Sequence, residues 1–251
     1  MHRFYVSKED ISENINNNQL VIKGEEFQHL SRVLRMSSGQ SVTIFDGEGL
    51  EYKGNIISIG KVEALVSVGE PLFSLKESSL EVWLVQGIPK GEKMELIIQK
   101  ATELGVKGII PLKTKRCVVK LEGKKQLERQ KRWQKVAIEA AKQCRRAVIP
   151  NILSACTLKE FLKGLPDKYN LLIPWEEGGA SLKSLIKEQE KRKVNPIYIM
   201  IGPEGGFEQS EVEEVRNYGG IPLTLGQRIL RTETASIATL SIVMFGWGDL
   251  G

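Results

Sequence analysis

Apolar and polar residues alternate with a period of two along the first part of the chain. Ser41–Phe45 alternates in this way, and Asn55–Ile59 and Val62–Val68 repeat the pattern after short turn-forming pairs. Such alternation predicts half-buried strands, and short strands joined by tight turns indicate a small barrel. One helix is expected among them, because apolar residues between Phe27 and Leu34 recur at helical spacing.

The alternation of apolar and polar residues stops between Gly69 and Ser79, where turn-forming residues are frequent. This stretch is predicted to be a linker. We therefore expect a β-barrel domain over residues 1–72 and a second domain over residues 73–251.

Strands and helices alternate in the second domain. Strands are predicted at Leu80–Val85, Gly108–Leu112, Tyr169–Ile173, Ile197–Ile201 and Ile221–Leu225. Helices are predicted at Gly91–Leu104, at Lys125–Arg145 and from the capping-box sequence Thr157–Glu160 onward. A further helix is predicted after each of the last three strands, and the last of these runs from about Glu233 to Trp247. This alternation predicts an α/β fold with a mostly parallel sheet that helices cover on both faces.

Positive charge is concentrated in one part of the chain. The net charge is only +5, but Gln86–Arg146 holds 17 Lys or Arg residues against 6 Asp or Glu. Such a concentration is typical of a protein that binds a polyanion. A lysine-rich, solvated helix face would give the same count, and charge alone does not separate the two interpretations.

Several classes of protein are not indicated. No apolar run approaches the ~20 residues of a membrane helix, and Met1–Val6 leads into polar sequence rather than the apolar region of a signal peptide. Cys117, Cys144 and Cys156 are too few and too scattered for a disulfide framework or a metal site. We expect a cytoplasmic protein that uses no metal and no membrane.

Three loops at predicted strand ends are candidates for a ligand site, because ligands of open α/β sheets collect there. They are Leu172–Gly179, Ile199–Phe207 and Leu225–Ala235. The second loop lacks the spacing of the dinucleotide and P-loop fingerprints. Its three glycines allow close backbone approach to a small ligand, although an ordinary glycine-rich turn would look the same.

The third loop places arginine at the start of a strongly apolar helix. Arg228 and Arg231 precede that helix, where the helix dipole already presents positive charge. A locally unfavourable choice of this kind indicates a functional residue.

These loops resemble a known family. Ile201–Phe207 together with Leu225–Ala235 is similar to the bacterial 16S ribosomal RNA uridine N3-methyltransferase family, and His29–Arg35, Gln99–Val106 and Glu139–Arg146 match further family elements. The resemblance covers essentially the whole chain. It implies a PUA-like RNA-binding barrel followed by a SPOUT-type α/β domain whose C-terminal end forms a deep trefoil knot.

The resemblance also implies a cofactor and partners. The cofactor would be S-adenosyl-L-methionine, held in the knot. The partner would be 16S ribosomal RNA within the small subunit or its precursor, and the enzyme would be a homodimer with sites near the subunit interface.

Methylation at uridine N3 requires removal of the N3 proton or stabilisation of the resulting anion. Arg231 is the candidate for holding the uracil carbonyls or the anion, since arginine is always charged and presents a donor fork. Glu233 is a candidate base or a helix cap. Gln143 and Arg145 are candidates for contacting the extruded base or a phosphate, and a solvated role for Arg145 is also open.

The predicted cofactor contacts are Leu172, Ile173, Pro174, Ile201, Gly202, Glu204, Gly206, Leu225, Gly226, Gln227, Ile229, Leu230, Thr234 and Ala235, with Ile173, Leu225 and Leu230 as apolar walls for the adenine. The predicted RNA contacts are Arg3, Arg32, Arg35, Lys90, Lys93, Arg116, Arg129 and Arg132.

Other functions remain open at this point. A SPOUT enzyme could methylate a ribose 2′-oxygen or guanosine N1 of transfer RNA, and a non-catalytic assembly factor could keep a vestigial pocket. A Rossmann-type nucleotide enzyme is disfavoured by the absence of its phosphate fingerprint.

Overall fold

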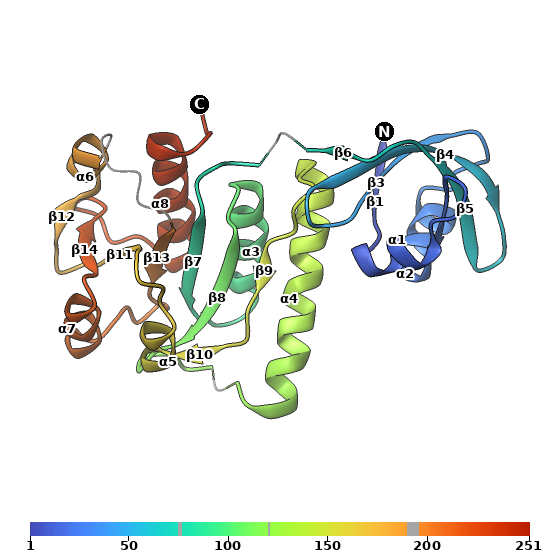
Figure 1. Cartoon of the computed structure of the whole chain (residues 1–251). Helices are drawn as coiled ribbons and strands as arrows, with labels where there is room; N and C mark the ends of the chain where they lie inside the picture. Colours follow the sequence, from blue (N-terminus) through green and yellow to red (C-terminus); the bar gives the residue numbers. More distant parts are fainter. Residues whose placement is uncertain (75–76, 120, 190–195) are drawn as a thin grey trace. The chain divides into compact units, whose positions relative to one another are not determined.

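The computed structural model describes residues 1–74, 77–119, 121–189 and 196–251. Backbone contacts divide it into two compact units, residues 1–77 with 141–149, and residues 78–140 with 150–251 (Figure 1). The boundary predicted between residues 72 and 73 stays a prediction. The return of the chain to the first unit at Ala141 is a feature that a single boundary does not include.

The first unit is built on a mixed sheet. Its strands are β1 (His2–Tyr5), β2 (Gln19–Lys23), β3 (Ser41–Phe45), β4 (Leu50–Ile59), β5 (Glu63–Val68) and β6 (Leu72–Phe73). They follow the path β1-β3-β4-β5-β2, with β6 pairing β4. The β1–β3 pair is parallel and the other pairs are antiparallel. Its helices are α1 (Lys8–Asn14), α2 (Gly24–Gln28) and the π-helical turn η1 (His29–Val33).

The sequence pattern located part of this unit correctly. The predicted helix around residues 27–34 is present as α2 and η1, and the strand Ser41–Phe45 is present as β3. The pattern missed β1, α1 and β2, and it found only the second half of β4. Of the predicted linker, residues 75–76 lie outside the described ranges and Leu72–Phe73 forms β6.

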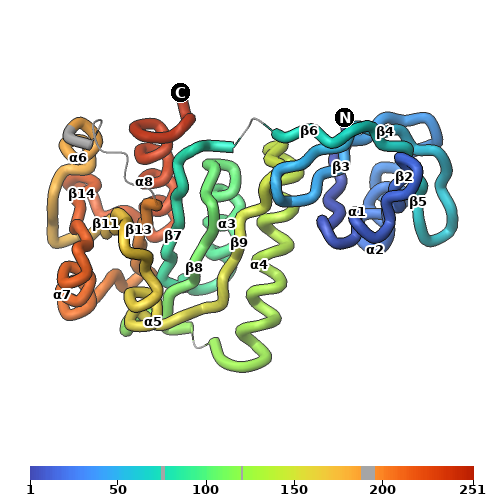
Figure 2. The backbone as a smooth tube through the Cα atoms, viewed as in Figure 1, coloured from blue at the N-terminus to red at the C-terminus, as the bar shows by residue number. Residues whose placement is uncertain are grey.

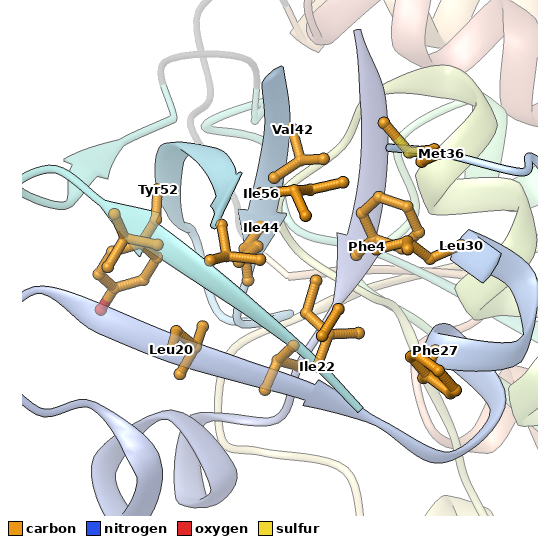
Figure 3. Close-up of a cluster of buried hydrophobic side chains, with 14 of the residues drawn as sticks. Phe4, Leu20, Ile22, Phe27, Leu30, Met36, Val42, Ile44, Tyr52 and Ile56 are labelled. Carbon is orange, nitrogen blue, oxygen red and sulfur yellow. The ribbon is translucent and has the colours of Figure 1, made fainter. Parts of the chain in front are cut away.

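The sheet encloses one apolar core. Figure 3 shows Phe4, Ile22, Ile44 and Ile56 pointing toward one another from four different strands, with Leu30 added from η1. All five side chains are buried. In β4 and β5 buried positions alternate with more exposed ones, as the period-two pattern predicts, whereas the last four residues of β3 are all buried.

Ion pairs attach the returning segment 141–149 to this unit. Arg146 Nη2 lies 2.8 Å from Glu77 Oε2, and Lys142 Nζ lies 2.8 Å from Glu26 Oε1. The Arg146 carbonyl accepts a hydrogen bond from Arg3 Nη2 at 3.0 Å. Because the three cationic side chains are each only 8% exposed, their charges are neutralised inside the unit rather than by water.

The second unit contains a parallel sheet. Its strands are β7 (Val82–Gly87), β8 (Gly108–Lys113), β9 (Asn151–Ile152), β10 (Cys156–Thr157), β11 (Asn170–Pro174), β12 (Ala180–Ser181), β13 (Ile197–Ile201) and β14 (Ile221–Thr224). Among the described residues the order is β10-β8-β7-β13-β11-β14-β12, with β9 on β8, and every pair is parallel. Its helices are α3 (Lys93–Glu103), α4 (Gly123–Cys144, whose end belongs to the first unit), α5 (Leu158–Lys163), α6 (Leu182–Gln189), α7 (Gln209–Asn217) and α8 (Thr232–Trp247).

Helices cover both faces of this sheet. Side chains of α5 and α7 share one apolar core with Val85, Leu171, Ile173 and Met200. Successive side chains of a strand point to opposite faces, and α8 packs against β13 and α3 (Figure 2). The predicted α/β fold with a parallel sheet is therefore confirmed, and the capping box at Thr157 is present at the start of α5.

In the described part of the chain, no helix is long and apolar enough to cross a bilayer. The threading of the C-terminal end into a knot stays a prediction.

We expect Arg146→Ala to destabilise the first unit, because it leaves the Glu77 carboxylate partly buried without its cation. The expected loss in the free energy of unfolding is about 2–4 kcal/mol, measured by urea denaturation. Arg145→Ala is the matched control, because Arg145 is exposed; its effect should stay within about 0.5 kcal/mol. Equal stability of the two variants would show that the ion pair between Arg146 and Glu77 does not stabilise the first unit.

Candidate functional site

A cavity of about 560 Å³ opens in the second unit. It is lined by the loops that follow β11, β13 and β14 and by the first turn of α8. These are the three loops that the sequence singles out, because the carboxyl ends of parallel strands meet at one edge of a sheet.

Most of the residues predicted to bind a cofactor line this cavity. They are Pro174, Ile201, Gly202, Glu204, Gly206, Leu225, Gly226, Gln227, Ile229, Leu230 and Ala235. Leu172, Ile173 and Thr234 do not line it. The side chains of Leu172 and Ile173 are buried in the sheet core, so Ile173 is not available as an apolar wall.

Sequence reasoning did not select several other lining residues. They are Trp175, Glu176, Pro203, Gly205, Phe207, Arg228 and Thr232, together with Lys93, which was assigned to RNA. All except Lys93 lie in the three chosen loops, so the signal for the loops was present. What the pattern could not give was the direction of each side chain.

The glycine loop after β13 requires its glycines for close packing. A Cβ atom at Gly87 would lie 2.5 Å from Pro203 Cδ, and one at Gly202 would lie 3.0 Å from the Gly206 Cα. Gly206 itself has φ +67°, and its N–H donates to the Pro203 carbonyl at 2.9 Å. Only glycine adopts this backbone without strain and leaves the cavity floor free of side chains.

Buried hydrogen bonds hold this loop to β7 and α8. The Thr232 hydroxyl donates to the Gly202 carbonyl at 2.6 Å and accepts from Gln86 Nε2 at 3.0 Å. Ser236 Oγ donates to Gln86 Oε1 at 2.6 Å. All three polar side chains are buried. We call Gln86, Thr232 and Ser236 the clamp.

Lys93 bridges two carboxylates at the cavity. Its Nζ lies 3.0 Å from Glu204 Oε1 and 3.5 Å from Glu233 Oε2. The hydrogen bond with Glu204 raises the pKa of Lys93. Burial alone would raise the pKa of Glu204, but hydrogen bonds from Lys93 and from the backbone outweigh it and lower that pKa. Lys93 is therefore part of the cavity, and its predicted contact with RNA stays a prediction.

The four candidate catalytic residues fall into two groups. Arg231 lines the cavity with an exposed side chain at the N-cap of α8. The Glu233 carboxylate is 15% exposed and is not among the residues that line the cavity; its Oε2 lies 3.5 Å from Lys93 Nζ. Gln143 and Arg145 are exposed residues of the first unit and are not among the residues that line the cavity.

The predicted RNA contacts also separate. Arg3 is buried, pairs with Glu51 at 3.0 Å and stacks over Phe45, so it is a structural residue rather than a phosphate contact. Arg116 Nη1 donates to the Gly205 carbonyl at 2.9 Å, and Arg132 pairs with Glu95 at 2.8 Å. The side chains of Arg32, Arg35 and Lys90 are exposed, and that of Arg129 is half-buried.

A metal site is not formed by the described residues. No three His, Cys, Asp or Glu side chains gather there at ligating distance. Burial raises the pKa of the Cys117 and Cys156 thiols, which opposes a thiolate nucleophile or ligand.

We expect Thr232→Val to destabilise the second unit, because it leaves the Gly202 carbonyl without its hydroxyl donor and removes one of the hydrogen bonds of the Gln86 amide. The expected cost is about 1–3 kcal/mol, measured by chemical denaturation. Thr234→Val, on the same helix turn but exposed, should cost less than about 0.5 kcal/mol. A cost at position 232 no larger than that at 234 would show that the clamp contributes nothing.

Comparison with known proteins places the chain in a family. The family model described as an RNA methyltransferase domain matches residues 76–244, and the RNA methyltransferase PUA domain matches residues 22–68. A ribosomal RNA small subunit methyltransferase E from Bacillus subtilis is 34% identical over 229 residues, which cover 89% of each chain.

Solved structures agree. The protein of that name from Neisseria gonorrhoeae, bound to S-adenosyl methionine, is 30% identical with a TM-score of 0.89, and the match covers 100% of both chains. A Legionella pneumophila methyltransferase with bound cofactor SAM is 34% identical with a TM-score of 0.87, covering 99% of this chain and 98% of that one. The chain therefore belongs to the ribosomal RNA small subunit methyltransferase E family of RNA methyltransferases.

Proposed function

We propose that this protein transfers a methyl group from S-adenosylmethionine to N3 of a uridine in 16S ribosomal RNA. The observation that carries the proposal is the glycine-floored cavity with exposed arginines at positions 228 and 231. Family membership supports the enzyme class, since relatives are named ribosomal RNA small subunit methyltransferases and a solved one is bound to the cofactor. The choice of uridine N3 rests on the sequence motifs.

The residues of the cavity fit the cofactor. The volume of about 560 Å³ is in the range of small-molecule sites. Ile201, Leu225 and Leu230 offer apolar contact, while the glycine floor exposes backbone groups. The buried Trp175 Nε1 has no partner among the described residues, as in a site that gains contacts on binding. When bound, S-adenosylmethionine supplies an electrophilic methyl carbon on a sulfonium.

The residues of the chain would act on the uracil. Arg231 donates hydrogen bonds to the uracil carbonyls and stabilises the N3 anion. Glu233, whose carboxylate pairs with Lys93 at 3.5 Å, accepts the N3 proton. Lys93 holds that carboxylate near the cofactor loop through its second ion pair with Glu204.

The RNA would be held through its phosphates by Arg32, Arg35, Lys90 and Arg129, and Gln143 and Arg145 stay candidates for contacting the extruded base or a phosphate. Phosphate contacts position a substrate without specifying it, so the target base is read after extrusion. The substrate would be the small subunit or its precursor in the cytoplasm. We also propose a homodimer and a knotted C-terminal end, both of which rest on the family resemblance.

Incubation with labelled S-adenosylmethionine and small-subunit particles that lack the modification should label N3 of one uridine, located by nuclease digestion and mass spectrometry. Arg231→Ala should lower kcat roughly 10²–10³-fold, and Glu233→Gln roughly 10²–10⁴-fold. Glu213→Gln, an exposed carboxylate of α7, is the control and should be fully active.

Other outcomes separate the alternatives. Label on a ribose oxygen or a guanine would replace the substrate assignment. Cofactor binding without label would show that the RNA or assembly state supplied is not the substrate, whereas failure to bind the cofactor at micromolar concentration would favour an assembly factor. No cofactor binding would exclude the enzyme.

RNA binding is expected to weaken steeply with salt, because phosphate contacts release counterions. Arg32→Ala and Arg35→Ala should each reduce the slope of log K against log salt by about 1, measured by fluorescence anisotropy on a small-subunit RNA fragment. Lys61→Ala, an exposed lysine in the turn between β4 and β5, is the control. Slopes unchanged in the arginine variants would remove these two residues from the RNA surface.

A further inference from the structure

The Glu176 side chain lies in the cavity without a partner. Glu176 follows β11 and lines the cavity, and among the described residues its carboxylate makes no hydrogen bond or ion pair that would explain its position. The other lining carboxylate, Glu204, is neutralised by Lys93 at 3.0 Å. Glu176 is therefore the acidic group that the folded chain leaves available to a ligand.

The carboxylate of Glu176 occupies the space above Gly206. A Cβ atom at Gly206 would lie 2.6 Å from Glu176 Oε1 and 3.2 Å from Oε2. Glycine at 206 thus opens the cavity floor and also admits this carboxylate. The glycine loop of β13 and the end of the neighbouring strand β11 together place an acceptor beside exposed backbone.

The chemistry of a carboxylate limits what it binds. An ionised carboxylate only accepts hydrogen bonds, and its two oxygens match a pair of adjacent hydroxyl donors. Ion pairs between exposed groups contribute little, whereas hydrogen bonds to a charged acceptor are stronger than neutral ones. Since Glu176 is exposed, a diol is the better partner than a hydrated ammonium group.

The same arrangement is known in general form from open α/β sheets. An acidic residue near a glycine-rich loop commonly binds a ribose hydroxyl of the nucleotide whose backbone contacts that loop. The cofactor of the proposed function carries one such cis-diol on its adenosyl ribose.

We propose that Glu176 is a cofactor-binding residue that accepts hydrogen bonds from the ribose hydroxyls of the adenosyl group. This inference rests on the proposed function, because it requires an adenosyl ligand in the cavity. Glu176 is thus added to the predicted cofactor contacts as a side chain that favours a ligand with ribose hydroxyls over one that lacks them.

Isothermal titration calorimetry of the full chain tests the proposal. The ligands are S-adenosylhomocysteine, 5′-methylthioadenosine, which lacks the amino-acid part, and 2′,3′-dideoxy-5′-methylthioadenosine. Glu176→Ala should weaken the first two about tenfold each, and Glu176→Gln should weaken them less. Glu177→Ala, the exposed neighbour that does not line the cavity, is the control and should bind as the unmodified protein does.

The dideoxy ligand gives the decisive comparison. It should bind the unmodified protein about as weakly as 5′-methylthioadenosine binds Glu176→Ala, and Glu176→Ala should not weaken it further, because the two changes remove the same interaction.

Three results would overturn the proposal while leaving the proposed function intact. The first is an unchanged affinity of Glu176→Ala for all three ligands. The second is a tenfold weaker binding of the dideoxy ligand to Glu176→Ala than to the unmodified protein. The third is a loss of affinity in Glu176→Ala for S-adenosylhomocysteine alone. Failure of the unmodified protein to bind any adenosyl ligand would instead reject the proposed function itself, and this inference with it. Thermal unfolding of each variant verifies that it is folded.

Discussion

The clamp formed by Gln86, Thr232 and Ser236 is the constraint on which the rest of the site depends. It joins the end of β7, the carbonyl of the glycine loop and the first turn of α8 through hydrogen bonds of 2.6–3.0 Å. These groups are buried, so each unmade bond would cost about 1–3 kcal/mol. These bonds therefore stabilise one arrangement of β7, the glycine loop and α8, and they position the residues that follow Thr232.

Charged side chains lie around the uncharged clamp. Lys93 pairs with two carboxylates, Glu204 and Glu233, so this cluster keeps one net negative charge, while the exposed side chains of Arg228 and Arg231 supply positive charge at the cavity. The lowered pKa of Glu204 means that its contribution to stability is present above its unfolded pKa and is lost as pH falls through the folded one. The raised pKa of Lys93 gives a contribution that is present below its unfolded pKa and is lost as pH rises through the folded one. The ion pair consequently persists over a wider pH range than isolated groups would allow.

The sequence located the loops of this site but not the roles of single side chains. Hydrophobic patterning predicts β13 because it is a continuous apolar run and α8 because it is long and strongly apolar, and motif spacing then selects their flanking loops. The burial of Arg3 and the position of Lys93 depend on acidic partners far along the chain, Glu51 for the first and Glu204 and Glu233 for the second. No local pattern encodes such pairs. The same limit explains the missed strands β9, β10 and β12, which are two residues long and exist through pairing with neighbours.

The returning segment 141–149 contains both ion-paired residues and exposed residues. Lys142 and Arg146 pair with acids of the first unit, whereas Gln143 and Arg145 remain exposed. Arg145 has φ +66°, and Arg35, also exposed, has φ +49°. In this left-handed region a residue other than glycine costs about 1 kcal/mol, and glycine or asparagine is the usual choice where a helix ends. Glycine would adopt this backbone at a lower cost. The exposed arginine side chain therefore does not explain the choice of residue through folding stability. The conformation is consistent with the predicted contact of Arg145 with RNA, which stays a prediction.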